Sequence, residues 1–269
     1  MTRDELTRRV AEFGERQPWN HNFQLPHGVQ TRPGVQLSHG KNEVKWERIR
    51  PLVEAVGVRG KRVLDVGCNE GFFSLQLEGM GASVVGIDVD ERRIAKAKFV
   101  RETLGRPGVS FDVVDIYGEP FARQPKFDLC LCMGFLHRIP DPFTAIARLG
   151  DRSDVLLFEW KALKFGPHQE PFAYFSPKGV DTADFYGTEY WLLSYAAVES
   201  ILRRLGFTRF HRVDDPTQRR ALLVSGKVDN PVFDRPDVIL HRGRLRAVAS
   251  HTKRYVRTLL GVISGRVNA

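Results

Sequence analysis

The chain has 269 residues, 42% of them hydrophobic and 27% charged, with a formal net charge of +9. This is the composition of an ordinary globular protein with one large core. The longest apolar runs fall far short of the roughly 20 residues that a membrane-spanning helix needs, and the charged start, MTRDELTRRV, is unlike a signal peptide. We therefore expect a cytoplasmic protein without a transmembrane segment.

The first 42 residues are predicted to form an N-terminal extension. A short helix over residues 4–16 is followed by an irregular stretch rich in proline, glycine, histidine and aromatic residues. An amphipathic helix is predicted over residues 43–56, where apolar side chains recur near one face.

From residue 61 onwards, strands and helices alternate regularly. The strands are short, continuous and apolar, as in a parallel sheet that is covered on both faces. Asp90 is a predicted helix N-cap, Gly105 a helix end, and Asp141 with Pro142 a second helix start. We predict a doubly wound, mostly parallel, seven-stranded Rossmann-like sheet, whose first five strands are RVLDVG (62–67), SVVGIDV (83–89), VSFDVVDI (109–116), FDLCLCMG (127–134) and DVLLFEW (154–160).

The alternation stops after Trp160, which predicts an insert over residues 160–192 in a domain that spans residues 43–227. Eight aromatic residues lie between positions 165 and 191, where the average of the chain predicts about three. They are expected to pack, or to form a lid that keeps water out. A helix over residues 194–205 and strands over residues 207–213 and 220–226 complete the domain.

The C-terminal tail, residues 228–269, is strongly basic. From His241 on it holds seven lysines and arginines and no acidic residue. Apolar residues at helical spacing predict a basic amphipathic helix, which can dock on its own domain, on an anionic membrane surface or on RNA.

Three cysteines, Cys68, Cys130 and Cys132, lie inside or beside apolar strands. Their odd number favours buried thiols over disulfide bridges. A single Cys-x-Cys pair is weak evidence for a metal, so no metal site is predicted.

A glycine-lined turn follows the first strand, in VLDVGCNEGFF. Gly67 and Gly71 allow a ligand to approach the backbone and the free N–H groups of the helix that follows. Asn69 stands where a dinucleotide-binding fingerprint has its middle glycine, and no Lys-Ser/Thr follows to hold a triphosphate. The carboxylate of Asp65 at the strand end can instead meet a cationic amino group.

Two further carboxylates follow successive strands. Asp88 ends the second strand 17 residues after Gly71 and can accept hydrogen bonds from both hydroxyls of a ribose. Asp115 ends the third strand and can accept one from an adenine amino group.

These motifs resemble those of the class I S-adenosylmethionine-dependent methyltransferases, and the match runs from about Lys61 to Gly226. The resemblance implies that S-adenosylmethionine is the cofactor and that the N-terminal segment, with Trp19, His21, His27 and the nearby Trp46, covers it. The cofactor-binding residues that it implies are Asp65, Gly67, Asn69 and Gly71 in the turn, Asp88 and Val89 at the ribose, Asp115 and Ile116 at the adenine, and Met133 at the end of the fourth strand.

A narrower resemblance extends beyond these shared motifs. LPHGVQTRPG, KWERI and FDLCLCMGFLHRIPDPF are similar to the family of the tRNA wobble-uridine methyl and carboxymethyl transferases. Members usually have Tyr-His after the fourth strand, whereas this chain has His137 and Arg138. The difference predicts a retained donor site and a changed acceptor.

The loop after the fourth strand lies beside the ligand in open α/β sheets. His137 is therefore a candidate general base for an acceptor hydroxyl, although it can equally bond the backbone. Glu159 ends the fifth strand at the same edge and can bind an amine, hold an acceptor hydroxyl or pair with Arg138.

Three functions compete. The first is a methyltransferase acting on the hydroxyl or amine of a small molecule, such as a saccharide or secondary metabolite. The second is a tRNA-modifying methyltransferase, which the basic tail favours. The third is a non-catalytic cofactor-binding module that uses the tail to bind a partner.

Overall fold

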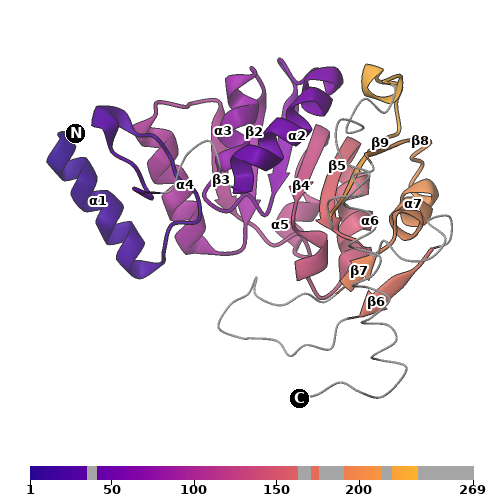
Figure 1. The fold of residues 1–269 in the computed structure, drawn as a ribbon. Helices are drawn as coiled ribbons and strands as arrows, with labels where there is room; N and C mark the ends of the chain where they lie inside the picture. Colours follow the sequence, from indigo (N-terminus) through magenta and orange to yellow (C-terminus); the bar gives the residue numbers. More distant parts are fainter. Residues whose placement is uncertain (35–40, 163–170, 176–190, 214–219, 236–269) are drawn as a thin grey trace, which may run out of the picture.

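The computed structural model describes residues 1–34, 41–162, 171–175, 191–213 and 220–235. Within these residues the seven predicted strands form one sheet with the order β3-β2-β1-β4-β5-β9-β8 (Figure 1). The first five strands run parallel, and β9 runs antiparallel to both of its neighbours. The doubly wound, Rossmann-like prediction is confirmed, with strands β1 (Arg62–Val66), β2 (Ser83–Asp88), β3 (Val109–Val113), β4 (Phe127–Met133), β5 (Ser153–Lys161), β8 (Arg209–Val213) and β9 (Arg220–Gly226).

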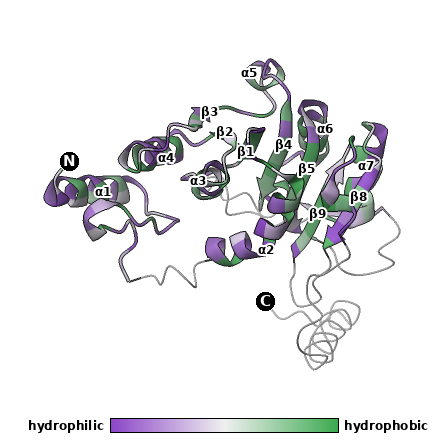
Figure 2. Cartoon of the chain, turned by 90° about the horizontal axis from the view of Figure 1, so that it is seen from above, coloured by the Kyte–Doolittle hydropathy of each residue, from purple (hydrophilic) through white to green (hydrophobic). Residues whose placement is uncertain are grey.

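Helices cover both faces of this sheet, as the continuous apolar strands require (Figure 2). Alternate strand residues point to opposite faces: Val63 packs into one core cluster and Leu64 into the other. The first cluster includes residues of α2 (Lys41–Val56), α3 (Phe72–Gly79) and α4 (Glu91–Thr103), and α1 (Arg3–Arg16) adds Leu6 and Val10. The second includes residues of α5 (Glu119–Ala122), α6 (Pro142–Arg152) and α7 (Tyr195–Arg204).

The predicted helix boundaries agree with the capping chemistry. The Asp90 side chain accepts a hydrogen bond from the Arg92 N–H at the start of α4, and Asp141 accepts one from Thr144 at the start of α6. The peptides after β4 form a short 3-10 helix, η3 (Leu136–Arg138). Two similar turns are η1 (Pro26–Gly28) and η4 (Pro231–Phe233).

The predicted insert contains a small second sheet. Strands β6 (Ala173–Phe175) and β7 (Trp191–Leu193) pair antiparallel. The Trp191 indole N–H donates to the Pro140 carbonyl at 2.9 Å, so this sheet packs against the loop that follows β4. The other aromatic positions of the insert, Phe165, Phe185, Tyr186 and Tyr190, lie outside the described residues.

The segment after β9 continues along the domain. Val232 is fully buried, Asn230 donates to the Val56 carbonyl at 3.1 Å, and Arg235 donates to the Pro51 carbonyl at 3.1 Å. Residues 228–235 therefore pack on α2, although the sequence pattern assigned them to the tail. The basic helix predicted further along falls in residues 236–269, outside the described part of the chain.

All three cysteines are buried and free. Burial raises the pKa of each thiol, which keeps the thiols protonated and unreactive. Within the described residues, no helix has the length and apolar character needed to cross a bilayer.

Candidate active site

Strands β1 and β4 lie side by side in the sheet, but their connections leave on opposite faces: α3 follows β1, and α6 follows β4. In open α/β sheets, ligands bind beyond the carboxyl ends of the strands at such a switch point. The turn after β1 and the loop after β4 meet there, because a Cβ atom added to Gly67 would lie 2.9 Å from Cδ2 of Phe135. The Phe135 ring therefore packs beside the glycine turn, a contact that the sequence did not reveal.

Asp88 connects the glycine turn to the end of β2. Its Oδ2 accepts the backbone N–H of Asn69 at 3.0 Å, and its Oδ1 accepts the N–H of Asp90 at 3.0 Å. Asn69 has a φ of 55°, in the left-handed region that asparagine tolerates better than most residues. The Asp88 carboxylate, only 3% exposed, is thus held rigidly at the predicted ribose position.

Asp65 lies behind the turn. Its Oδ2 accepts a hydrogen bond of 2.6 Å from the Ser74 hydroxyl on α3, and its side chain is buried. Burial raises the pKa of this carboxyl to about 7. The carboxyl therefore anchors α3 to β1 directly beneath the turn, and contact with a ligand's amino group stays a prediction.

The predicted adenine and ribose residues lie along the same edge of the sheet. Val89 is 39% exposed directly after β2. Asp115 is also exposed, and its Oδ1 accepts the Tyr117 N–H at 2.9 Å, whereas Ile116 is buried in the core. Met133, at the end of β4, is half-buried.

The His137 side chain is buried and bonded to the backbone, a geometry that disfavours its predicted role as a general base. Its side chain is fully buried, and its Nδ1 accepts the Lys161 backbone N–H at 3.3 Å. Burial, together with the nearby cations Arg220 and Arg138, lowers its pKa to about 2. The imidazole is therefore neutral, with its accepting nitrogen already occupied by the backbone. Its Nε2 has no hydrogen-bond partner in the described part of the chain.

Replacing His137 by asparagine is expected to preserve the bond from Lys161 and the pH profile of any turnover between pH 6 and 9. Because the folded protein keeps this histidine neutral, its contribution to stability is full above the unfolded pKa of 6.5 and is lost as the pH falls. The wild type should lose about 2 kcal/mol more unfolding free energy than His137→Asn between pH 7.5 and 5, at about 1.4 kcal/mol per unit below that pKa. Urea unfolding at the two pH values measures this difference, and a pH profile that changes shape in the variant would restore the base role.

Glu159 is the centre of a charged cluster at the carboxyl end of β5. Its buried Oε2 lies 3.0 Å from Nη1 of Arg220 on β9 and 3.5 Å from Nζ of Lys45 on α2. All three groups surround Gly134, at which an added Cβ would lie 3.4 to 3.5 Å from an atom of each. We call Lys45, Glu159 and Arg220 the Gly134 cluster.

The cations of the Gly134 cluster differ from the expected partner of Glu159. The sequence suggested Arg138, which lies half-buried on η3. Lys45 and Arg220 stand 114 and 61 residues from Glu159 in the chain, and nothing in their local patterns links them to it. The Oε1 atom of Glu159 is buried without a hydrogen-bond partner among the described residues. This oxygen is therefore an unsatisfied acceptor at the carboxyl end of β5.

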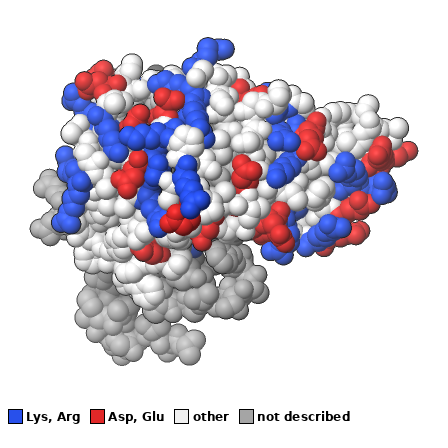
Figure 3. Space-filling model, turned by 180° about the vertical axis from the view of Figure 1, so that it is seen from behind, with Lys and Arg blue, Asp and Glu red and all other residues white. Residues whose placement is uncertain are grey.

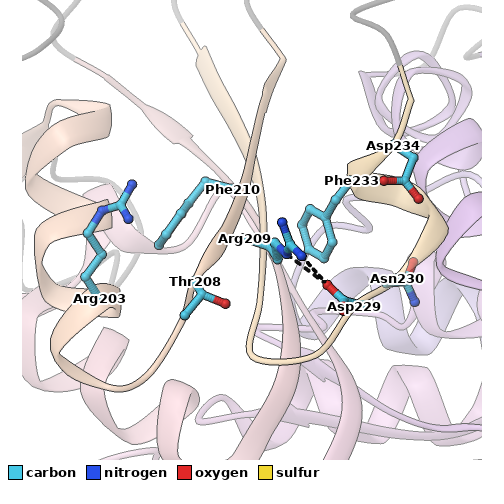
Figure 4. A pocket seen from close by; sticks show the side chains of 8 residues that line it. All are labelled: Arg203, Thr208, Arg209, Phe210, Asp229, Asn230, Phe233 and Asp234. Atoms are coloured by element: carbon cyan, nitrogen blue, oxygen red, sulfur yellow. Dashed lines mark hydrogen bonds and ion pairs between the residues drawn. The ribbon is translucent and has the colours of Figure 1, made fainter.

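A cavity of about 630 Å³ lies at the amino-end edge of the sheet, opposite the glycine turn (Figure 4). Arg209, which lines it, pairs in register with Gly226, and Gly226 pairs with Val155 near the start of β5. The cavity is therefore at the amino end of β5, away from the glycine turn. Its Arg209 is engaged by Asp229 at 2.7 Å. In the described ranges no three His, Cys, Asp or Glu side chains gather as a metal site would require.

The strand order, the glycine turn at the switch point and the carboxylate at the end of β2 define the Rossmann-like methyltransferase fold. In agreement, residues 58–152 match the family model described as "Methyltransferase domain". This match includes the turn, Asp88, Asp115 and the loop after β4.

Curated relatives cover the same region. A ubiquinone biosynthesis O-methyltransferase of Aromatoleum aromaticum (strain DSM 19018 / LMG 30748 / EbN1) is 38% identical over 108 residues, which are 39% of this chain and 45% of that protein. The enzyme of the same name from Thiobacillus denitrificans (strain ATCC 25259 / T1) is 32% identical over 106 residues, with the same coverage. The chain thus spans less than half of the length of these relatives.

Solved structures share the fold over more of the chain. The N-terminal domain of EvdMO1, crystallised in the presence of SAH and D-fucose, aligns with a TM-score of 0.65 at 23% identity and covers 85% of this chain and 98% of that one. Magnesium protoporphyrin IX methyltransferase (ChlM) from Synechocystis PCC 6803, with bound SAM, aligns with a TM-score of 0.52 at 20% identity, covering 73% and 86%. The likeness at these identities is one of fold.

Proposed function

We propose that this protein is an S-adenosylmethionine-dependent methyltransferase that acts on a hydroxyl or amine of a small molecule. The observation that carries the proposal is the rigid link between Asp88 and Asn69 in a glycine turn at the switch point. The match of residues 58–152 to the methyltransferase model and the names of the curated relatives support it.

The residues at the switch point fit this donor. Asp88 offers carboxylate oxygens for two ribose hydroxyls, with the exposed Val89 beside it, and the exposed Asp115 is available to an adenine amino group. The N-terminus of α3 offers backbone N–H groups to the donor's methionine carboxylate. When bound, the donor supplies a methyl group on a sulfonium. The chain has to align the acceptor with that methyl group and to exclude water.

The Gly134 cluster is the proposed acceptor end of the site. An acceptor hydroxyl or amine needs a group that takes its proton or its hydrogen bond. Among the described residues, Glu159 Oε1 is a buried oxygen without such a bond, and Arg220 and Lys45 hold the other oxygen of the same carboxylate. Glu159 therefore replaces His137 as the candidate proton acceptor.

Glu159→Gln is expected to lower the turnover number at least tenfold and to leave donor affinity within a factor of two. The amide keeps the size of the side chain but cannot take a proton from the acceptor. Single-turnover rates and calorimetry with S-adenosylhomocysteine separate the two effects. Unchanged turnover would remove Glu159 from the reaction, and lost donor affinity would place it in the donor site instead.

The proposal as a whole is tested by methyl transfer from radiolabelled S-adenosylmethionine to two acceptor pools, bulk tRNA and an extract of small glycosides and metabolites. We expect label in the small-molecule pool. Label in tRNA, lost on deleting residues 241–269, would establish the tRNA function in its place. Binding of S-adenosylhomocysteine without transfer to either pool would favour a non-catalytic module.

The distribution of charge over the described surface supports a tRNA function less than the basic tail does. Seven of the nine net positive charges of the chain lie from His241 on, outside the described residues. On the face drawn in Figure 3, lysines and arginines are interspersed with acidic side chains. A nucleic-acid surface is expected to show a more continuous basic stripe. The same tail could contact an anionic membrane, which vesicle co-sedimentation would detect.

A further inference from the structure

The segment that follows α1 lies against the glycine turn. We call residues 17–31 the N-terminal strap. Glu70, inside the turn and fully buried, accepts the backbone N–H of Asn20 on both carboxylate oxygens, each at 3.0 Å, and the N–H of His21 on Oε2 at 2.8 Å. The turn itself therefore satisfies the backbone donors of the strap.

Lys96 of α4 also contacts both Glu70 and the strap. Its ammonium, on a side chain that is 1% exposed, donates to the carbonyls of Gln17 at 2.6 Å and Pro18 at 3.1 Å, and it lies 3.3 Å from Glu70 Oε1. The same ammonium lies 4.8 Å from the centre of the Trp19 ring. A buried ion pair persists only when its remaining hydrogen bonds are satisfied, and here the strap backbone satisfies them.

Two side-chain hydrogen bonds connect the strap to the glycine turn and to the residues that follow β2. Asn20 Nδ2 donates to Oδ1 of Asn69 at 3.3 Å, and Gln17 Nε2 donates to Oδ2 of Asp90 at 3.1 Å. Asn69 and Asp90 are the two residues whose N–H groups hold the Asp88 carboxylate. The strap thus contacts the Asp88 site on each side.

Apolar contacts fix the strap over the same helices. The ring of Trp19 lies 6.4 Å from that of Phe99 on α4, and the ring of Phe23 lies 6.5 Å from that of Phe72 at the start of α3. Both aromatic residues of the strap are buried.

We propose that Glu70 is a positioning residue for donor binding: through Lys96 and the strap backbone, it holds Asn69 and Asp90 where Asp88 can receive the donor. The inference rests on the proposed function, since it assigns the donor site to this edge of the sheet. In this arrangement, strap docking and donor binding stabilise each other.

Glu70→Gln is the sharpest test, because the amide keeps the size of the side chain but offers one acceptor oxygen where two N–H groups and an ammonium bind two. In calorimetry on the full chain, the variant should bind S-adenosylhomocysteine at least tenfold more weakly than the wild type. Hydrogen exchange should report faster exchange in peptides covering residues 17–31. Saturating S-adenosylhomocysteine should slow that exchange in the wild type.

Glu199→Gln is the matched control. Glu199 is also buried and ion-paired, with Arg212 at 2.5 Å, but it lies on α7 at the other end of the sheet. This control should lower stability without changing the affinity for S-adenosylhomocysteine. Equal affinities of Glu70→Gln and the wild type would overturn the inference.

Asn20→Ala covers the case in which Glu70→Gln does not fold. The side chain of Asn20 is exposed, so its loss should leave the fold intact and weaken S-adenosylhomocysteine binding severalfold. Wild-type affinity in Asn20→Ala would overturn the inference equally. Absence of binding by the wild type would instead refute the proposed function, together with the role of Glu70 in it.

Discussion

Asp88→Ala is expected to weaken the binding of S-adenosylhomocysteine at least a hundredfold. Hydrogen bonds to a charged group contribute about 1.5 to 3 kcal/mol each, and a ribose supplies two hydroxyl donors. Two such bonds exceed the roughly 2.7 kcal/mol that correspond to a hundredfold change in Kd. The substitution also frees the N–H groups of Asn69 and Asp90, which shape the turn. Calorimetry on the folded variant measures the loss.

Asp112→Ala is the control for removal of a carboxylate nearby. Asp112 is exposed on β3 and pairs in register with Ile87, next to Asp88. The Asp112→Ala variant should bind S-adenosylhomocysteine with the affinity of the wild type. If Asp88→Ala also bound normally, the donor would have to lie elsewhere, and the proposed function would fail.

Gly71→Ala is expected to produce the largest loss of stability, about 2 to 4 kcal/mol, because a left-handed backbone and an overpacked core are both unfavourable to alanine. Gly71 has a φ of 83°, and a Cβ atom there would lie 2.4 Å from Cζ of Phe111 on β3. That ring also fills the space beside Gly86 on β2. Chemical denaturation measures the difference.

Two further variants separate the causes of that loss. Gly105→Ala has the same kind of backbone, with a φ of 62°, but no atom lies within 4 Å of its added Cβ. It should lose about 1 kcal/mol, the cost of the left-handed backbone alone. Phe111→Leu should recover part of the stability of Gly71→Ala by making room. Equal losses of unfolding free energy in Gly71→Ala and Gly105→Ala would show that the Phe111 ring moves aside without cost.

The positions of the residues assigned to the donor half of the proposed site could be predicted because these residues lie at strand ends. The turn around Gly67, Asp88 at the end of β2 and Asp115 after β3 occupy positions that the parallel sheet brings to one edge. Periodicity predicts the strands, and the direction of parallel strands then determines where their ends meet.

The acceptor half could not be predicted in the same way. His137 follows β4, as expected, but its side chain turns into the protein and bonds the Lys161 backbone. Conversely, Lys45 comes from a helix that precedes the sheet, and Arg220 comes from the antiparallel strand β9. Only packing decides which of these charged side chains meet.

The N-terminal strap was likewise predictable in part only. Its composition predicted an irregular cover, but the sequence offers no sign that Glu70 and Lys96, 26 residues apart, would bury their charges against its backbone.

Local patterns of apolar residues, glycines and caps therefore determined the seven-stranded sheet, the glycine turn and the order of its carboxylates, since each depends on residues close in the chain. The tertiary structure alone decided the neutral, buried state of His137, the Gly134 cluster and the docking of the strap. The physical reason is that burial and ion pairing depend on groups brought together from distant positions, and no local pattern records them.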